Sequence, residues 1–179
     1  MDMKNSVFIA TSLDGYISDI NGKIDWLHSF PNPENDDMGY TQFMNSIDAL
    51  VMGRTTFEIV CGFDIDWPYK KPVFVLSNTL TEIPEKAKGN VFIMSGSLTE
   101  VLKNIHQKGF ENLYIDGGKT IQGFLKEGLI DEMIITIIPT LLGGGTKLFD
   151  ELPYPIAFQC FDTKHFLGKV AQNHFKRSK

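Results

Sequence analysis

Hydrophobic positions in the first 130 residues fall into short, β-branched runs separated by segments in which they recur every three or four residues. The runs predict buried strands, which we place at 6–13, 48–53, 72–77, 90–95 and 112–116. The intervening segments predict helices with one apolar face, which we place at about 34–45, 54–60, 97–107 and 120–127. This alternation is typical of a mostly parallel sheet flanked by helices.

The pattern changes after residue 130, where apolar runs follow one another without a helical segment between them. Residues 129–145, 156–168 and 169–175 predict strands joined by short turns. They indicate an antiparallel edge, so the predicted fold class is α/β with a mixed, mostly parallel sheet. The segment from Ile24 to Tyr40 contains two prolines and several acids, and we expect a mobile loop there that leads into a helix.

Length and composition narrow the function classes. The chain has 179 residues, 42% of them hydrophobic, and we expect one domain over residues 1–179. Its net charge of -5 argues against a general nucleic-acid-binding protein, which needs a basic surface. Cys61 and Cys160 lack partners at zinc-ligand spacing, so we predict neither a disulfide framework nor a metal site. The N-terminal apolar run is too short to span a bilayer, and we expect a cytoplasmic protein without membrane association.

Two glycine clusters match nucleotide-binding motifs only in part. Gly118-Lys119-Thr120 ends like a P-loop, but Leu113 stands where that motif requires a glycine. Gly143-Gly144-Gly145 lacks the last glycine of GxGxxG, and it follows a late strand instead of opening a long helix. We therefore predict neither ATP hydrolysis nor a standard Rossmann site.

The clearest chemical signal is DALVMGRTTFE, in which a strand ends at Gly53 and a helix begins at once with Arg54, Thr55 and Thr56. Free N–H groups at a helix start attract anions, and Arg54 and the threonine hydroxyls can add bonds to a phosphate. The alternative is a capped helix with a solvated arginine.

Two further strand ends open toward the same sheet edge. Ser77, Asn78 and Thr79 follow one strand, where they form either a ligand crevice or an ordinary polar turn. Gly117 and Gly118 follow another strand, and the lack of Cβ atoms lets backbone approach a pyrophosphate there, unless the pair only makes a tight turn.

Taken in order, these runs resemble the successive signatures of dihydrofolate reductase-like proteins over nearly the whole chain. The resemblance is closer to the reductase domain of riboflavin biosynthesis and its stand-alone relatives than to true dihydrofolate reductase. It implies a three-layer dihydrofolate reductase-like fold that binds NADPH. The runs are VFIATSLDGYI, Asp25-Trp26-Leu27, VMGRTTFE, VFVLSNT, YIDGGKTIQGFL and IIPTLLGGGTKLF.

The resemblance also implies where the cofactor lies. Ala10 and Ile17 would flank the nicotinamide, and Ser77 would lie beside the adenine ribose with Asn78 next to it. The adenosine-side phosphates and the pyrophosphate would be held by the two glycine turns, namely by Gly53, Arg54, Thr55 and Thr56 and by Gly117, Gly118, Lys119, Thr120 and Ile121. In this family the paired glycines are commonly joined by a cis peptide, which we expect at Gly117-Gly118.

The resemblance implies that the proton donor is a carboxylate on the first helix. Counting back from VMGR gives Asp37, with Asp36 and Glu34 as alternatives and a helix-start acid as the structural explanation. Asp14 at the end of the first strand is the other candidate, as a substrate ligand or as part of a turn.

On the substrate side we expect Trp26 at the cleft mouth and residues 141–147 along its border. Leu142 would contact the substrate, and Lys147 would either meet a substrate phosphate or remain solvated.

These features predict an NADPH-dependent reductase of a pterin- or pyrimidine-like molecule, of the 5-amino-6-(5-phosphoribosylamino)uracil reductase type or the dihydrofolate reductase type. The chain lacks the H-x-E and P-C-x-x-C signature of the linked deaminase, so it is not the bifunctional form. The alternative is a noncatalytic nucleotide-binding protein that retains the fold. We also expect a homodimer, because an apolar run such as IITIIPTLL makes a poor free edge.

Overall fold

The computed structural model describes residues 3–29 and 31–178, so residue 30 of the predicted loop lies outside the described part. The elements in chain order are β1 (Lys4–Ser12), β2 (Tyr16–Ser18), a 3-10 helix (Asp25–Ser29), α1 (Tyr40–Ser46), β3 (Ala49–Gly53), α2 (Arg54–Cys61), β4 (Val73–Leu76), a 3-10 helix (Glu85–Ala87), β5 (Val91–Met94), α3 (Leu98–Gln107), β6 (Asn112–Asp116), α4 (Gly118–Lys126), β7 (Glu132–Ile138), β8 (Thr146–Lys147), β9 (Phe158–Phe166) and β10 (Val170–Arg177).

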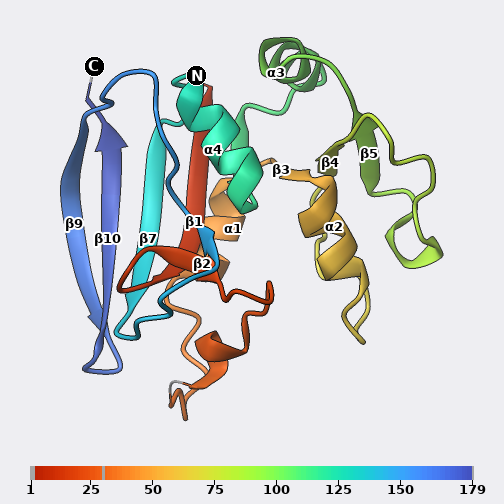
Figure 1. Ribbon diagram of the computed structural model, residues 1–179. Coiled ribbons are helices and arrows are strands. Elements are labelled where there is room, and N and C mark those ends of the chain that lie inside the picture. The colour runs from red at the N-terminus through yellow and green to blue at the C-terminus, as the bar shows by residue number, and fades with distance from the viewer. Residues whose placement is uncertain (1–2, 30, 179) are drawn as a thin grey trace.

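The main sheet has the strand order β5-β4-β3-β6-β1-β7-β10-β9 (Figure 1). The strands from β5 to β7 are parallel, whereas β10 pairs antiparallel with β7 on one side and with β9 on the other. The mixed, mostly parallel sheet is therefore confirmed, but the antiparallel edge begins one strand later than expected, since β7 lies parallel to β1. β2 and β8 form a separate two-stranded sheet that the sequence pattern did not predict.

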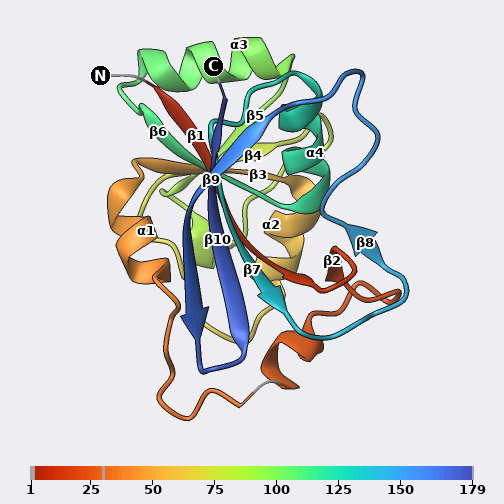
Figure 2. The same ribbon diagram turned by 90° about the vertical axis from the view of Figure 1, so that its left-hand side faces the viewer.

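Helices cover both faces of the sheet, with α1 and α4 on opposite sides in Figure 2. One core packs α3 and α4 onto the sheet through residues such as Ile105, Ile121 and Phe124, all fully buried. The other packs α1 and α2 through Phe43 and Phe57. This double coverage explains why β3 is buried along nearly its whole length, since a strand between two helical layers has no solvent face.

The predicted helix over residues 34–45 is wrong in its first half, because α1 begins only at Tyr40. Side-chain oxygens of Asn32, Asp36 and Asp37 accept backbone N–H groups two to four residues ahead. Such local bonds offer the backbone an alternative to the helix. Positive φ angles at Asn35 (49°) and Met38 (52°) complete the series of turns.

The outer strand at the late end of the sheet is β9, whereas IITIIPTLL lies mainly in β7, between β1 and β10. The apolar run from which we expected a homodimer is thus already paired on both sides. β9 is largely exposed and carries Asp162, Lys164 and His165, which are polar residues of the kind that discourage edge association. Within residues 3–29 and 31–178, no helix combines the length and apolar character needed to cross a bilayer.

Candidate functional site

The predicted ligand residues gather at the carboxyl edge of the parallel strands. Gly53 is in register with Leu76 at the end of β4, and Met52 is in register with Asp116 at the end of β6. Ser77, Gly53 and Gly117 therefore follow or close three adjacent strands, with β1 next in line. In an open α/β sheet this edge is the usual ligand crevice. It faces the lower part of Figure 1, where β2 and the loop before α1 lie.

The turns at Gly53 and Gly117 lie so close together that each contacts the other. A Cβ atom at Gly117 would lie 2.2 Å from Thr56 Oγ1, and one at Gly53 would lie 2.9 Å from Thr120 Oγ1. The threonine of each turn thus occupies the space beside the glycine of the other. Gly117 also has a φ of +91°, which disfavours any other residue. The glycines are needed for the two helix starts to meet.

The small β2–β8 sheet covers the second glycine turn. A Cβ at Gly118 would lie 2.7 Å from Ile17 Cδ1 and 3.2 Å from Thr146 Cγ2. Ile17, expected beside the nicotinamide, therefore packs on Gly118, expected beside the pyrophosphate. Because neighbouring residues of a strand point to opposite faces, Lys147 is directed away from this contact. Its backbone carbonyl accepts a hydrogen bond from Gln122 at 2.8 Å.

The helices that begin at this crevice have no side-chain cap among the described residues, whereas α3 has a full capping box. In α3, Ser97 accepts from the Glu100 backbone and the Glu100 carboxylate accepts from Ser97. The first turns of α2 and α4 keep their N–H donors for another acceptor. Two uncapped helix starts side by side suit a pyrophosphate. Lys119 is exposed there, whereas the Ile121 side chain is fully buried and its backbone N–H donates to the Gly117 carbonyl at 2.9 Å.

Arg54 connects the first turn to the end of β4. Its Nη1 donates to Thr79 Oγ1 at 2.9 Å, and its Nε lies 3.5 Å from Glu58 Oε1. Ser77 Oγ accepts from the backbone N–H groups of Thr79 and Leu80, which fixes the turn that carries exposed Asn78. The predicted phosphate and ribose residues are therefore brought together.

These donors fit a phosphorylated dinucleotide. The glycine turns offer main-chain N–H groups, and Arg54 and Thr55 lie exposed on the first turn of α2. The expected cis peptide is not found, because every described peptide bond, including Gly117-Gly118, is trans. The positive φ of Gly117 makes the sharp change of direction instead.

Asp116 is the polar residue that the sequence reasoning missed. Strand alternation places it on the same face as Tyr114, and the register of β1 puts Ala10 on that face too. Burial raises the pKa of Asp116 despite a 2.8 Å hydrogen bond from the Gly117 N–H. Its charge, added to burial, raises the pKa of Tyr40 to about 12 and also raises that of Tyr69. Asp116 is therefore a carboxyl with a raised pKa on the same face of the sheet as Ala10.

Asp14 holds a loop in place. Its carboxylate accepts from Ser12 Oγ at 2.6 Å, Leu142 N at 3.1 Å and Gly143 N at 2.8 Å. The Ser12 hydrogen bond is the main reason why its pKa falls to about 2, with the backbone bonds from Gly143 and Leu142 adding to it. An acid so strongly ionised has no proton to give at neutral pH. Its catalytic role stays a prediction, in which it would orient the substrate side through Leu142.

Asp37 lies at the start of α1, where it accepts from the N–H groups of Gly39 and Thr41, both at 2.9 Å. The Thr41 hydroxyl is the leading cause of its lowered pKa. These bonds fix the turn that precedes α1, whose first residue is Tyr40. Its role as proton donor is untested, and Asp116 has the more suitable environment.

The remaining substrate-side predictions lie around the loop before α1. Trp26 is half-buried on the 3-10 helix Asp25–Ser29. Nearby, Gln172 of β10 donates to the Met38 carbonyl and to Thr136 Oγ1, both at 2.9 Å, and so joins this loop to the sheet. Thr136 is in register with Ala10, which places the pair on the face of Asp116.

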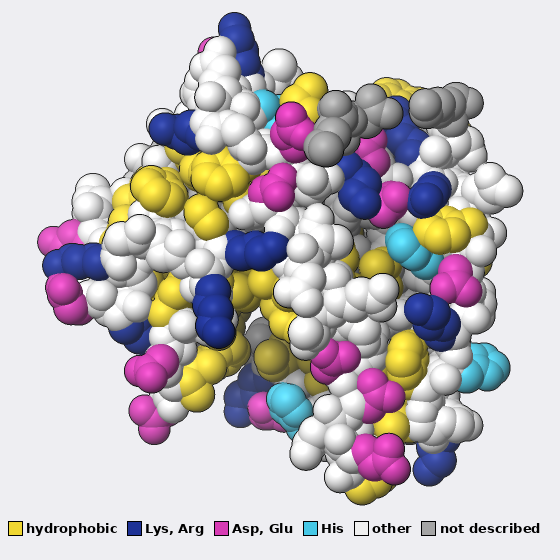
Figure 3. Space-filling view, turned by 180° about the vertical axis from the view of Figure 1, so that it is seen from behind, with side chains coloured by type: hydrophobic (Ala, Val, Ile, Leu, Met, Phe, Trp, Pro, Cys, Tyr) yellow, Lys and Arg dark blue, Asp and Glu magenta, His cyan; other side chains and the backbone are white. Residues whose placement is uncertain are grey.

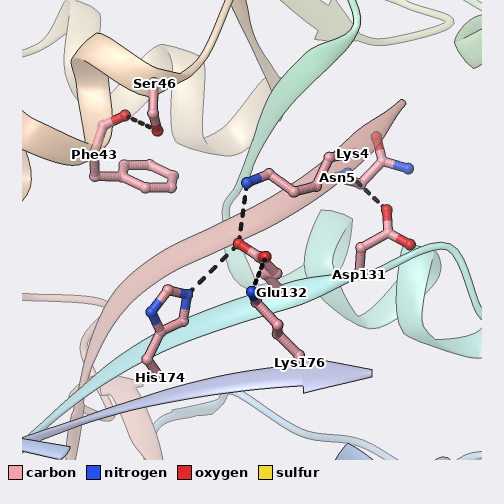
Figure 4. A network of polar contacts seen from close by, with 8 residues as sticks. All are labelled: Lys4, Asn5, Phe43, Ser46, Asp131, Glu132, His174 and Lys176. Carbon is pink, nitrogen blue, oxygen red and sulfur yellow. Dashed lines mark hydrogen bonds and ion pairs between the residues drawn. The ribbon is translucent and has the colours of Figure 1, made fainter. Parts of the chain in front are cut away.

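A second group of charges lies away from the crevice, at the amino edge of the sheet. Lys4, His174 and Lys176 surround the Glu132 carboxylate at 3.1, 3.5 and 3.6 Å (Figure 4). No group of three or more His, Cys, Asp or Glu residues in the described ranges has the arrangement of a metal site. Acidic and basic side chains are interspersed on the face seen in Figure 3.

Comparison with known proteins agrees with this geometry. A family model described as the RibD C-terminal domain matches residues 6–171. The chain is 35% identical over 180 residues to the uncharacterized protein YwjB of Bacillus subtilis (strain 168), covering 99% of this chain and all of YwjB. It is 54% identical, with a TM-score of 0.96, to a Shewanella sp. PV-4 protein whose name assigns it provisionally to riboflavin biosynthesis, over 99% of this chain and all of that one.

Two more distant structures show the fold. The Thermotoga maritima diaminohydroxyphosphoribosylaminopyrimidine deaminase/5-amino-6-(5-phosphoribosylamino)uracil reductase has a TM-score of 0.78 at 14% identity, over 99% of this chain and 57% of that one. Dihydrofolate reductase from Enterococcus faecalis, complexed with NADP(H) and RAB-propyl, has a TM-score of 0.63 at 18% identity, over 98% of this chain and 97% of that one. The dihydrofolate reductase-like fold is confirmed.

Proposed function

Because the chain belongs to the RibD C-terminal domain family, we propose that it is an NADPH-dependent reductase that transfers a hydride to a pyrimidine- or pterin-like heterocycle. The observation that carries this proposal is the contact between the turns at Gly53 and Gly117, which joins two uncapped helix starts into one anion-binding surface. Family membership supports an oxidoreductase in general, and the charge beside Gly53 favours the phosphorylated cofactor.

Each part of the crevice has a task in this proposal. Arg54 would bind the 2′-phosphate, and the turn at Gly117 and Gly118 would bind the pyrophosphate. NADPH, when bound, supplies the hydride. Ala10 leaves room for a flat ring on β1, and Ile17 of β2 helps exclude water.

Asp116 completes the site on the substrate side. Burial raises its pKa and so favours the protonated form more than in an exposed carboxyl, and in that form its Oδ can donate to a ring nitrogen or carbonyl oxygen of the heterocycle. The neighbouring Tyr40 hydroxyl keeps its proton, because its own pKa is raised. Asp116 is therefore better suited to hold and transfer a proton than Asp14, whose pKa is lowered to about 2.

A glycine pair tests the cofactor site. Gly117→Ala would force a Cβ against Thr56, so we expect loss of the NADPH-induced rise in melting temperature. Gly123→Ala is the matched control, because its Cβ would meet only Leu98 Cδ1 at an ordinary 3.7 Å. Circular dichroism shows whether both variants fold. A normal NADPH response in folded Gly117→Ala would contradict the proposed cofactor site.

Turnover separates the reductase from the noncatalytic alternative. We expect purified protein to oxidise NADPH when pyrimidine or pterin substrates are added, as followed by NADPH absorbance. Stabilisation by NADPH without oxidation by any of them would favour a nucleotide-binding protein without turnover. The cytoplasmic location remains a prediction, and so does the homodimer, which sedimentation at micromolar concentration tests.

A further inference from the structure

We propose that a cavity at the carboxyl end of β7 holds an uncharged, hydroxyl-bearing substituent of the substrate, so that the preferred substrate is a dephosphorylated, nucleoside-like heterocycle. This inference rests on the proposed function and goes further by naming the substrate class. The cavity has a volume of about 300 Å³. Its side chains come from the loop before α1, the end of β7 and the β9–β10 turn; those used here are Leu27, His28, Asn32, Asn35, Ile138 and Leu167.

The cavity lies on the same carboxyl edge of the sheet, at the strand next to the one that carries Ala10. Along the carboxyl edge, the phosphate turns follow β4, β3 and β6, and Ala10 lies on β1. The next strand is β7, whose last residue, Ile138, is in register with Ser12 at the end of β1. A ring placed at Ala10 would therefore have this cavity on the side away from the phosphate turns. That is the direction in which a ring substituent would extend.

The lining suits hydroxyl groups and carbon. Leu27, Ile138 and Leu167 supply apolar surface, and His28 and Asn35 add polar groups. None of the described residues that line the cavity is Lys, Arg, Asp or Glu. A sugar or polyol chain presents alternating hydroxyl and C–H groups, which such a mixed surface can contact without burying a charge.

Asn32 is held in a fixed orientation at this cavity. Its Nδ2 donates to the Asp36 carbonyl, and its Oδ1 accepts from the Asp36 N–H, both at 2.9 Å. An amide oxygen has two lone pairs, so Oδ1 retains the capacity to accept from a hydroxyl. A pre-oriented acceptor favours a neutral donor over an anion.

The charge around the cavity disfavours a phosphate. From residue 24 to residue 53 the chain has no Lys or Arg, and its acids are Asp25, Glu34, Asp36, Asp37 and Asp48. These acids make the segment net negative, which disfavours a phosphate dianion there. Lys23 and Lys169 are close to the cavity residues in sequence, but neither lines the cavity, and Lys164 lies 3.7 Å from Asp162.

The cofactor side of the crevice has the opposite character. Around Gly53 and Gly117 the chain combines uncapped helix starts with Arg54 and Lys119, which is what a phosphate needs. At the β7 cavity it offers amides, an imidazole and aliphatic carbon instead. One edge of the sheet thus has a phosphate end and an uncharged end.

A matched ligand pair tests the proposal. With saturating NADPH, 5-amino-6-(5-phosphoribosylamino)uracil and its phosphatase-treated product are compared in steady-state turnover and in thermal shift. We expect kcat/KM at least about tenfold higher for the dephosphorylated compound, since each factor of ten corresponds to about 1.4 kcal/mol. A preference for the phosphorylated compound, or equal use of both, overturns the inference but leaves the reductase proposal standing.

Failure of both compounds to shift the melting temperature also overturns it, because the cavity is then no subsite for this class. In that case a retained shift with NADPH alone shows that the cofactor half of the proposed function survives. Loss of the NADPH shift would mean that the proposed function itself has failed. The two failures are therefore distinguishable in one experiment.

A charge added to the cavity provides a second, independent test. His28→Lys introduces a cation at an exposed lining position. We expect it to move the preference toward the phosphorylated compound by up to about fivefold, the size of one exposed ion pair. His28→Gln is the control, since it retains a polar side chain without charge and should leave the preference unchanged. An identical preference in both variants would show that the substituent does not reach the cavity.

Discussion

The guanidinium of Arg54 donates to the Thr79 hydroxyl at 2.9 Å, which links the first turn of α2 to the loop after β4. Each residue comes from a different predicted turn, and their contact fixes the guanidinium across the mouth of the crevice. Arg54 is half-exposed, so a ligand phosphate can reach it.

Arg54→Ala should therefore weaken NADPH binding much more than NADH binding. We expect about tenfold loss for NADPH, as for one charge-assisted hydrogen bond, because only NADPH has the 2′-phosphate. Isothermal titration with both cofactors measures the difference. Lys119→Ala serves as the comparison, since a residue at the pyrophosphate turn should affect both cofactors alike. Equal losses for NADPH and NADH in Arg54→Ala would remove the phosphate assignment.

Asp116→Asn should lower kcat by about a hundredfold or more while leaving the NADPH affinity unchanged, because an amide cannot transfer the proton. Since the pKa of Asp116 is raised in the folded state, wild-type activity should be full below that pKa and fall as pH rises through it. The variant should lack this limb of the profile. Steady-state kinetics across pH provides the measurement.

The same substitution has an opposite expected effect on stability. A carboxyl with a raised folded pKa stabilises the protein at low pH, and that contribution is lost as pH rises through the folded value. Asp116→Asn should therefore raise the melting temperature at neutral pH. Asp150→Asn, which changes an exposed carboxylate paired with Lys126, should alter neither kcat nor its pH profile. A variant of Asp116 with normal turnover would exclude it as proton donor.

Much of the fold follows from local pattern. The predicted and observed bounds of β6 agree, because a short apolar run between polar residues is most favourable as a buried strand. β2 and β8, with three and two residues, are too short to show a period. The first part of the helix predicted at 34–45 is wrong, because the spacing of apolar residues does not reveal the hydrogen bonds that the side chains of Asn32, Asp36 and Asp37 accept from the backbone.

The site residues also fall into those that a local sequence pattern reveals and those that it does not. The turns at Gly53 and Gly117 could be found from sequence, since a strand end followed at once by a helix start is a local signal. The raised pKa of Asp116 depends on burial by the folded chain, which a local sequence pattern does not show. A signal was nevertheless available, because an acid two residues after Tyr114 in a buried strand must share its face.

Asp14→Asn should loosen the loop at residues 141–145. Asparagine keeps one oxygen, but its NH₂ group would oppose the N–H of Leu142 or Gly143, which now donate to the carboxylate. Hydrogen exchange of these two amides should become faster, with the amides of β3 unchanged. Because the pKa of Asp14 is about 2, the wild-type loop should stay protected down to nearly that pH.

Ser12→Ala is the control for this loop, since it removes the hydroxyl donor and keeps both backbone bonds to Asp14. Its exchange rates should lie between those of wild type and Asp14→Asn. Unchanged exchange at Leu142 and Gly143 in Asp14→Asn would show that the carboxylate does not hold the loop.

Glu132→Gln should destabilise the protein by about 1–2 kcal/mol at neutral pH, because it leaves Lys4, His174 and Lys176 facing an uncharged amide. Burial alone would raise the pKa of Glu132, but the hydrogen bond and charge of Lys4, then the charges of Lys176 and His174, lower it overall. Its stabilising effect is thus present above the ordinary value of 4.5 and is lost as pH falls through the lower folded value. Urea unfolding from neutral pH to about pH 3 should show the difference between wild type and variant shrinking. Glu85→Gln, which changes the exposed pair with Lys88, is the control and should change the free energy of unfolding little at any pH. An equal loss of stability in both variants would show that the charges around Glu132 stabilise the fold no more than an exposed ion pair does.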